Sequence, residues 1–198
     1  MEKREKKDID VFSNEKRTAS ENRKFLEKNG IYTVNVLGSP GSGKTTFIES
    51  IATRLGRKKC LVIEGDLSSK IDSDMLNKKG IKAVQINTKT TCHLIPQDIK
   101  KALGKAKLKG KEFLFIENIG NLVCPANKDL GENLRVLVSS CPEGSDKPLK
   151  YPPMFRFADV VVVSKTDMEK ASGFSFKKFR KNALKINGKL ERESVDCR

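Results

Sequence analysis

Short apolar runs alternate along the chain with segments in which apolar residues recur every three or four positions. The runs are rich in β-branched and large apolar side chains, which is typical of buried strands. The helical spacing predicts helices over 46–55, 71–79 and 96–103, each between two runs. Strands that alternate with helices in this way predict an α/β fold with a mostly parallel sheet and helices on both faces. The predicted strands are 31–37, 60–64, 83–86, 113–117, 135–139 and 158–163.

The two ends of the chain differ from this repeating middle part. The first thirty residues are charged with few apolar positions, and they predict a helical lead-in that stops at Asn29 and Gly30. We expect the lead-in to pack against the domain edge through Phe25 and Leu26. The predicted organisation is a helical lead-in at 1–30, one domain at 31–188 and a diverged or truncated tail at 189–198.

Composition favours a globular protein of one domain. The 198 residues are 37% hydrophobic and 33% charged, which allows a core beneath a very polar surface. No run approaches the roughly 20 apolar residues of a membrane-spanning helix, and the first residues lack the apolar segment of a signal peptide. Five cysteines without disulfide-like spacing indicate free thiols or metal ligands in a reducing compartment. We therefore expect a cytoplasmic protein without membrane contact.

The formal net charge of +15 raises the question of nucleic-acid binding. The lysines are spread along the chain and mixed with 25 acidic residues, and no basic segment contains the interleaved aromatic residues of common RNA-binding modules. The strongest basic cluster, 176–181, is explained equally well as the solvated side of a helix. Charge alone therefore does not favour nucleic acid as a partner.

A phosphate-binding loop follows the first predicted strand. Residues 38–45 read Gly-Ser-Pro-Gly-Ser-Gly-Lys-Thr, a full match to the pattern G-x-x-x-x-G-K-[ST]. The glycines let backbone N–H groups turn inward around an anion, Lys44 supplies a charge for the β- and γ-phosphates, and Thr45 can ligate Mg²⁺. The following helix directs its N-terminus at the phosphates. The predicted phosphate-binding residues are Gly38, Gly41, Ser42, Gly43, Lys44, Thr45 and Thr46.

Two later strands also end in functional motifs. The run 113–117 ends in Glu117, and a carboxylate at the tip of a buried strand can hold Mg²⁺ beside the phosphates. The last predicted strand leads into Ser-Lys-Thr-Asp, which matches the guanine-recognition pattern [NT]-K-x-D except for Ser164 at its first position. In this pattern Asp167 accepts hydrogen bonds from guanine, and the stem of Lys165 lies along the purine plane. The sequence therefore favours guanine over adenine.

Candidate metal ligands lie in two loops. Cys92 and His93 are adjacent, and Cys124 follows the next predicted strand, so both loops are expected at the same edge of the sheet. These side chains suit Zn²⁺ or Ni²⁺, but three ligands leave a tetrahedral or square-planar site incomplete unless a dimer shares it or one position is open. Considered by itself, such spacing is more often a Cys-His pair in a loop and an unrelated buried cysteine. The spacing does not decide between these alternatives.

Several stretches together resemble the HypB family, GTPases that serve nickel insertion during maturation of [NiFe]-hydrogenases. The most specific stretch is 117–126, Glu-Asn-Ile-Gly-Asn-Leu-Val-Cys-Pro-Ala, which separates the chain from the related urease accessory GTPase UreG and its Cys-Pro-His metal motif. The resemblance covers about residues 20–188. The other stretches that carry it are 38–45, 64–66, 87–88, 92–94, 129–132, 143–152 and 164–167.

The resemblance implies a SIMIBI-class P-loop GTPase that binds GTP or GDP with Mg²⁺. Thr45, Asp72 in the first switch and Glu117 would surround Mg²⁺. The N–H of Gly120 would sense the γ-phosphate, and Lys150 matches a family lysine that is important for nucleotide handling. Water would be the nucleophile of a slow hydrolysis. The residues implied in catalysis are Lys44, Asp72, Glu117 and Gly120.

For the metal, the resemblance implies a switch between two subunits. Cys92, His93 and Cys124 match ligands for nickel or zinc at a dimer interface, where a second subunit supplies the ligands that one chain lacks. GTP would order the switch loops, favour the homodimer and change the metal geometry, and hydrolysis would release or transfer the metal. The implied partners are a second copy of the chain, a HypA-type nickel chaperone and a hydrogenase large subunit.

The chain departs from the family pattern at both ends. No cysteine precedes Cys60 and His93 is the only histidine, so the N-terminal nickel-storage motif of some members is not supported. The chain after Asp167 is short, and we expect the family's final strand, its second guanine loop and its closing helix to be missing, which would expose a sheet edge.

These departures motivate a second hypothesis. The chain could be a metal- or partner-binding module that retains the fold but hydrolyses GTP poorly. A third hypothesis, a P-loop ATPase or kinase, needs no guanine loop and predicts that ATP competes as well as GTP.

Overall fold

The computed structural model describes residues 2–66, 71–88, 91–192 and 194–196. None of the helices in these ranges has the length and apolar character to cross a membrane. The helices are α1 Glu2–Lys28, α2 Lys44–Leu55, α3 Ile71–Lys78, α4 Pro96–Lys105, α5 Lys147–Lys150, α6 Pro152–Phe157, α7 Glu169–Ser172 and α8 Phe176–Ile186. The strands are β1 Tyr32–Gly38, β2 Cys60–Asp66, β3 Lys82–Asn87, β4 Phe113–Glu117, β5 Leu134–Ser140, β6 Val160–Ser164 and β7 Ser194–Asp196. Short 3₁₀ helices lie at Arg57–Lys59, Cys141–Glu143, Thr166–Met168 and Gly188–Arg192.

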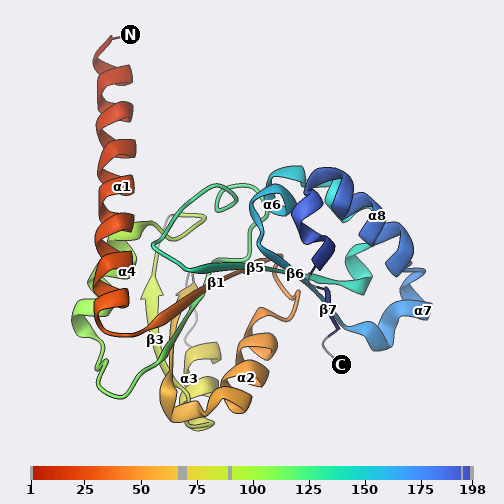
Figure 1. The fold of residues 1–198 in the computed structure, drawn as a ribbon, viewed down its shortest axis with the longest axis horizontal. Coiled ribbons are helices and arrows are strands. Elements are labelled where there is room, and N and C mark those ends of the chain that lie inside the picture. Colours follow the sequence, from red (N-terminus) through yellow and green to blue (C-terminus); the bar gives the residue numbers. More distant parts are fainter. Residues whose placement is uncertain (1, 67–70, 89–90, 193, 197–198) are drawn as a thin grey trace.

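The strands form one parallel sheet in the order β3-β2-β4-β1-β5-β6-β7 (Figure 1). The central strand β1 pairs with β4 on one side and β5 on the other, so that Val36 lies in register with both Glu117 and Val136. Because parallel strands end at the same edge of a sheet, the loops after Gly38 and Glu117 emerge side by side. The predicted α/β fold with a parallel sheet is confirmed.

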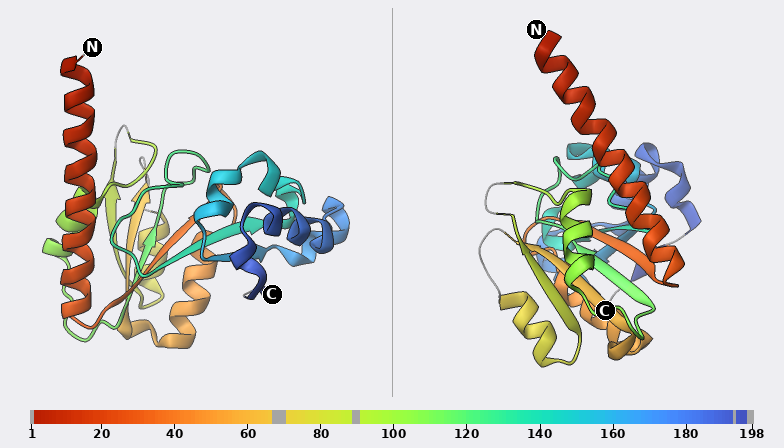
Figure 2. Two further views of the ribbon diagram at one scale, coloured as in Figure 1. Left: turned by 45° about the horizontal axis from the view of Figure 1, so that its top comes forward. Right: turned by 90° about the vertical axis from the view of Figure 1, so that its left-hand side faces the viewer.

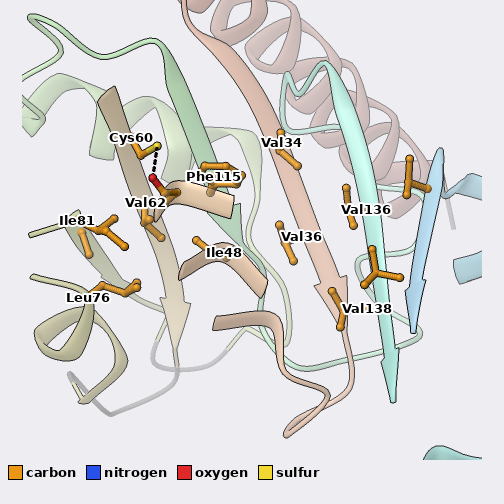
Figure 3. Packing of buried hydrophobic residues seen from close by; sticks show 14 residues of the cluster. Val34, Val36, Ile48, Cys60, Val62, Leu76, Ile81, Phe115, Val136 and Val138 are labelled. Atoms are coloured by element: carbon orange, nitrogen blue, oxygen red, sulfur yellow. Dashed lines mark hydrogen bonds between the residues drawn. The ribbon is translucent and has the colours of Figure 1, made fainter. Parts of the chain in front are cut away.

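One face of the sheet is covered by α2 and α3. Val36, Val62 and Phe115 project from three neighbouring strands onto Ile48 of α2 and Leu76 of α3 (Figure 3). All five side chains are at most 2% exposed. Burial of each large side chain contributes about 1.5–3 kcal/mol to folding, so this cluster fixes the helix that follows the phosphate-binding loop against the sheet.

The opposite face carries two further apolar clusters. In the first, Ile116 of β4 packs with Leu26 of α1 and Ile99 of α4. In the second, Phe155 of α6 and Phe179 of α8 meet edge to face with ring centroids 5.8 Å apart. The predicted arrangement of helices on both faces is therefore confirmed.

The predicted N-terminal helix is present as α1, and its N-terminal part extends away from the sheet (Figures 1 and 2). Leu26 is buried as expected, whereas Phe25 is 44% exposed and only partly covered. Adjacent helical residues point about 100° apart, so the two side chains are buried to different extents. The buried amide of Asn22 joins α1 to the body, because it donates to the carbonyls of Pro96 at 2.9 Å and Leu130 at 3.2 Å.

The expectation that the final strand is missing is wrong. Strand β7 pairs in parallel with Val161–Val163 of β6 at the edge of the sheet. Just before it, Leu190 is buried against the cluster that contains α8. Three residues are too few to show an alternating pattern, and the pairing depends on backbone groups that side-chain patterns do not report. The domain boundaries themselves stay a prediction, and residues 197 and 198 lie outside the described part of the chain.

Candidate functional site

The phosphate-binding loop connects β1 to α2, and its shape depends on glycine. A Cβ atom at Gly38 would lie 2.4 Å from the carbonyl oxygen of Val138, and Gly43 has a φ of 92° at the N-cap of α2. A larger residue at position 38 would collide with the neighbouring strand, and at position 43 it would strain the backbone. The loop therefore keeps the conformation in which backbone N–H groups face an anion at the helix N-terminus.

Lys44 folds back over this loop. Its Nζ donates to the carbonyl of Ser39 at 3.0 Å and to that of Gly38 at 3.3 Å, and only 7% of the residue is exposed. Burial lowers the pKa of Lys44, and nearby carboxylates, Glu117 foremost, act in the opposite direction. A phosphate group beside Lys44 would add the negative charge that favours its ammonium form.

Oxygen ligands gather beside Lys44 in a cleft of about 620 Å³. Thr45 Oγ1 donates to Glu117 Oε1 at 2.8 Å, and Asp72 lines the same cleft. Hydroxyl and carboxylate oxygens are the donors that Mg²⁺ prefers, so this set fits the ion. The structure thus brings together the three residues expected around Mg²⁺.

Glu64 is a cleft residue that the sequence analysis did not single out. It lies on β2, is 3% exposed and lines the same cleft. A signal was present, because Glu64 follows the apolar run 60–63 just as Glu117 follows 113–116. It lines this cleft together with the carboxylates of Asp72 and Glu117.

Gly120 lies directly against the phosphate-binding loop. A Cβ atom at this position would lie 2.8 Å from both the ring Cγ and the backbone nitrogen of Pro40. The residue also lines the phosphate cleft. This close approach is available only to glycine, and the role of its N–H in sensing phosphate stays a prediction.

The structure does not bring Lys150 to this cleft. Lys150 is exposed on α5 and pairs with Asp146 at 2.9 Å. It lines neither the phosphate cleft nor the neighbouring cleft that is described next. Instead Lys147, one turn earlier, contacts the loop through Ser39 Oγ at 3.1 Å and pairs with Glu143 at 3.1 Å. The nucleotide role of Lys150 stays a prediction for the assembled protein.

A second cleft, of about 740 Å³, adjoins the first at Gly43 and Lys165. Ser164, Lys165 and Asp167 line it, as expected of a base-binding site. Lys165 has a backbone φ of 55°. Residues other than glycine rarely adopt this conformation, but a tight functional loop can impose it. Ser164 Oγ donates to the carbonyl of Ser42 at 2.5 Å and so links this loop to the phosphate-binding loop.

The candidate metal ligands come together at the same edge of the sheet. Cys92 and His93 follow β3, Cys124 follows β4, and the ligand atoms of all three lie within 4.8 Å of one another. Two thiols and one imidazole form a donor set that suits Ni²⁺ or Zn²⁺. Cys124 is therefore a neighbour of the Cys-His pair, and metal binding by the three residues stays a prediction.

The surroundings of the cluster influence its protonation. Burial lowers the pKa of His93, the charge of Lys128 adds to this, and Glu15 opposes it. A hydrogen bond with Cys124 raises the pKa of the Cys92 thiol. His93 can therefore present a neutral nitrogen at neutral pH, whereas the Cys92 thiol must lose its proton when it binds a metal.

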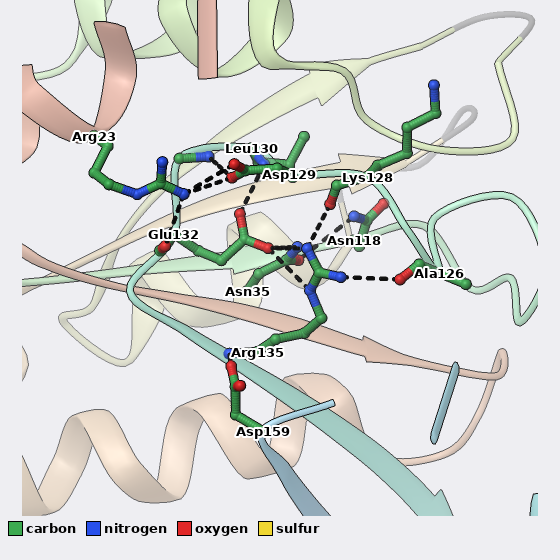
Figure 4. A network of polar contacts seen from close by, with 11 residues as sticks. Arg23, Asn35, Asn118, Ala126, Lys128, Asp129, Leu130, Glu132, Arg135 and Asp159 are labelled. Atoms are coloured by element: carbon green, nitrogen blue, oxygen red, sulfur yellow. Dashed lines mark hydrogen bonds and ion pairs between the residues drawn. The ribbon is translucent and has the colours of Figure 1, made fainter. Parts of the chain in front are cut away.

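The loop from 118 to 133 carries residues of both sites and is held by buried polar contacts (Figure 4). Arg135 of β5 donates to the carbonyls of Ala126 at 2.9 Å and Lys128 at 2.8 Å, and it pairs with Glu132 at 2.6 Å. Glu132 also accepts from the amide of Asn35 at 3.2 Å. These contacts fix an irregular loop to the centre of the sheet.

Comparison with known sequences shows the family of the chain. The family model described as the CobW/HypB/UreG nucleotide-binding domain matches residues 32–192. The hydrogenase/urease maturation factor HypB of Helicobacter hepaticus is 42% identical over 197 residues, covering 93% of this chain and 81% of that protein. The probable hydrogenase maturation factor HypB of Methanocaldococcus jannaschii is 40% identical over 183 residues, covering 92% and 83%.

Solved structures show the same similarity. The hydrogenase maturation factor HypB from Archaeoglobus fulgidus superposes with a TM-score of 0.84 at 39% identity, over 93% of this chain and 90% of that one. HypB from Helicobacter pylori in complex with nickel superposes with a TM-score of 0.87 at 39% identity, over 92% and 86%. The signal recognition particle receptor FtsY of Elizabethkingia anophelis shares the fold alone, with a TM-score of 0.54 at 17% identity.

Proposed function

Because the chain belongs to the CobW/HypB/UreG family, and within it to the HypB maturation factors, we propose that it is a GTPase that assists nickel insertion into an [NiFe]-hydrogenase. One observation carries this proposal. A single loop follows Glu117, the last residue of β4 and part of the phosphate cleft, and reaches Cys124 in the metal cluster. A nucleotide and a metal ion can therefore influence the same few residues.

The nucleotide would lie across the two adjoining clefts. Lys44 and the N–H groups of its loop hold the β- and γ-phosphates, and Asp167 accepts hydrogen bonds from the guanine edge. Thr45, Asp72 and Glu117 hold Mg²⁺, which neutralises charge that develops on the phosphate oxygens. Catalysis rests on this positioning, with water as the nucleophile, and turnover is slow.

Nickel or zinc is the cargo rather than a catalyst of hydrolysis. One chain offers two thiols and an imidazole, so a second copy would complete the coordination by placing its own cluster opposite. GTP favours this dimer, and hydrolysis releases the metal. The partners that fit this role are a HypA-type nickel chaperone and a hydrogenase large subunit, in the cytoplasm.

The test compares Lys44→Ala with a matched control, Lys101→Ala on the exposed side of α4. We expect Mg²⁺-dependent GTP turnover to fall at least about 100-fold in Lys44→Ala, because a charge-stabilising donor to the phosphates is lost. Nickel binding should persist, and the control should resemble the unmodified protein. Turnover is measured by phosphate release and nickel binding by chelator competition.

Two outcomes would contradict the proposal. If the unmodified protein turns over GTP no faster than Lys44→Ala, the chain is a metal- or partner-binding module without useful hydrolysis. If ATP competes as well as GTP, the chain is an ATPase or a kinase.

A further inference from the structure

Asn121 lies between the nucleotide cleft and the metal cluster. Its backbone forms an antiparallel bridge with Gly38, the first residue of the phosphate-binding loop. Its side-chain Oδ1 accepts from the N–H groups of Val123 at 2.8 Å and Cys124 at 3.3 Å, and its Nδ2 donates to the carbonyl of Cys92 at 3.4 Å. One residue therefore contacts the phosphate-binding loop and the backbone of two candidate metal ligands.

The residues that precede Asn121 are held tightly, so Asn121 cannot move independently of the phosphate-binding loop. Gly120 packs against Pro40 so closely that an added Cβ atom would lie 2.8 Å from it. The buried Asn118 accepts from the N–H groups of Leu94 at 3.2 Å and Ile119 at 3.0 Å. A shift of the phosphate-binding loop would therefore move residues 120 and 121 relative to an anchored neighbour.

Resting on the proposed function, we propose that Asn121 is the positioning residue through which bound nucleotide changes the geometry of the metal site. Its short amide group is both a donor and an acceptor, so it can hold Cys92 and Cys124 at once. When the backbone at Gly38 moves, the amide changes the separation of the two cysteine backbones. Two thiolates at a changed separation bind Ni²⁺ with a changed affinity.

The choice of variants follows from the two kinds of contact. Asn121→Ala removes all three side-chain hydrogen bonds. Asn121→Asp keeps an acceptor for the N–H groups of Val123 and Cys124 but cannot donate to the carbonyl of Cys92. Asn29→Ala, an exposed asparagine at the end of α1, is the matched control.

The experiment measures coupling rather than affinity alone. Ni²⁺ affinity is determined by chelator competition with a non-hydrolysable GTP analogue and with GDP, and the thiolate-to-nickel absorption band is recorded in both states. In the unmodified protein and in Asn29→Ala we expect the two affinities to differ by about 5-fold or more, within the usual range of allosteric coupling. In both Asn121 variants the ratio should fall to about one, and the band should no longer differ between nucleotides.

The reverse measurement provides a thermodynamic check. Linkage requires that Ni²⁺ change the relative affinity for the GTP analogue and GDP by the same factor, so this ratio should also approach one in the Asn121 variants. Because the aspartate preserves most of the local hydrogen bonds, it keeps the test decisive if the alanine variant does not fold.

Three results would overturn the inference. A ratio that is unchanged in both Asn121 variants would show that coupling takes another route, while GTP turnover and nickel binding would leave the proposed function intact. A loss of Ni²⁺ affinity that is equal in both nucleotide states, with the ratio retained, would show a purely structural role. If the unmodified protein shows no coupling, the nucleotide-dependent metal switch itself fails.

Discussion

At the scale of single residues, Ser164 shows how a departure from a motif can keep its physical role. Serine is shorter than the usual asparagine, yet its hydroxyl reaches the carbonyl of Ser42 at 2.5 Å because the end of β6 lies beside the phosphate-binding loop. The base loop and the phosphate loop therefore stay joined. The proposed recognition of guanine rests on Asp167, which lines the second cleft and which the substitution does not alter.

We therefore expect Ser164→Ala to weaken GDP binding by about 2- to 12-fold, the effect of losing one hydrogen bond worth about 0.5–1.5 kcal/mol. The preference for GDP over ADP should not change.

Asp167→Asn, in contrast, should reduce the preference for GDP over ADP about 100-fold or more, because the NH₂ group of the asparagine amide would lie opposite an N–H donor of guanine. Fluorescent nucleotide titration with unlabelled competitors measures both quantities, and a loss of selectivity in Ser164→Ala would contradict the assignment.

At the scale of elements, the irregular loop from 118 to 133 lines the phosphate cleft at Gly120 and carries Cys124 of the metal cluster. Loops of this length without regular structure are uncommon in compact domains and usually have a function. Here Arg135 on β5 holds the loop, because its guanidinium donates hydrogen bonds to the carbonyls of Ala126 and Lys128 and to the carboxylate of Glu132. Both Arg135 and Glu132 are largely buried, at 12% and 5% side-chain exposure.

Arg135→Met should destabilise the folded protein by about 3–5 kcal/mol, because it leaves the buried charge of Glu132 without its partner. The double variant Arg135→Met with Glu132→Gln should recover part of the loss, since no buried charge remains. Urea denaturation measures the free energy of unfolding of each variant, and an m-value equal to that of the unmodified protein shows that only stability has changed. The exposed Arg156→Met serves as a control. A double variant no more stable than the single one would show that the uncompensated charge is not the cause.

At the scale of the whole molecule, α1 is joined to the rest by ion pairs as well as by the buried side chain of Leu26. Ion pairs connect Arg23 with Asp129 at 2.8 Å and Lys100 with Glu21 at 2.8 Å. Burial alone would raise the pKa of Asp129, but hydrogen bonds from Arg23 and from the N–H of Gly131 outweigh it, so the pKa lies below its ordinary value of 3.8. The attachment of α1 therefore depends on pH and on salt.

A carboxyl group whose pKa is lowered by folding contributes stability that is fully present above its unfolded pKa and is lost as the pH falls through its folded pKa. Stability should therefore decline below about pH 4, and Asp129→Asn should make that decline shallower. At pH 7 the variant should lose only about 0.5–1 kcal/mol, because the pair is partly exposed and screened. Thermal unfolding between pH 3 and 7 measures the decline in stability, with Asp74→Asn on the exposed side of α3 as the control. A decline as steep in Asp129→Asn as in the unmodified protein would contradict the prediction.

Local patterns predicted most of the longer regular elements, although the eleven-residue helix α8 was considered only as one explanation of the basic cluster at 176–181. The strand at 113–117 was predicted with the bounds it has, and the helices from 71 and from 96 begin where expected. Helices α5 and α6 were not predicted, because four and six residues cannot show a helical period. Strand β7 was missed for the same reason.

The sequence by itself determined the chemistry that is encoded by neighbouring residues. The phosphate-binding loop, the acid at the tip of β4 and the Lys-Thr-Asp of the base loop depend on backbone conformation and burial, which apolar periodicity and glycine positions report directly. The pattern also showed which side chains could bind a metal, although not that they would meet.

Only the tertiary structure decided which distant residues share a site. Strand β2 separates β3 from β4, yet the loops after β3 and β4 converge so that Cys92 and His93 meet Cys124. The same packing brought Glu64 into the phosphate cleft and placed Lys147, rather than Lys150, against Ser39. Strand order and loop paths follow from how all the apolar faces pack at once, and no local window of the sequence contains that information.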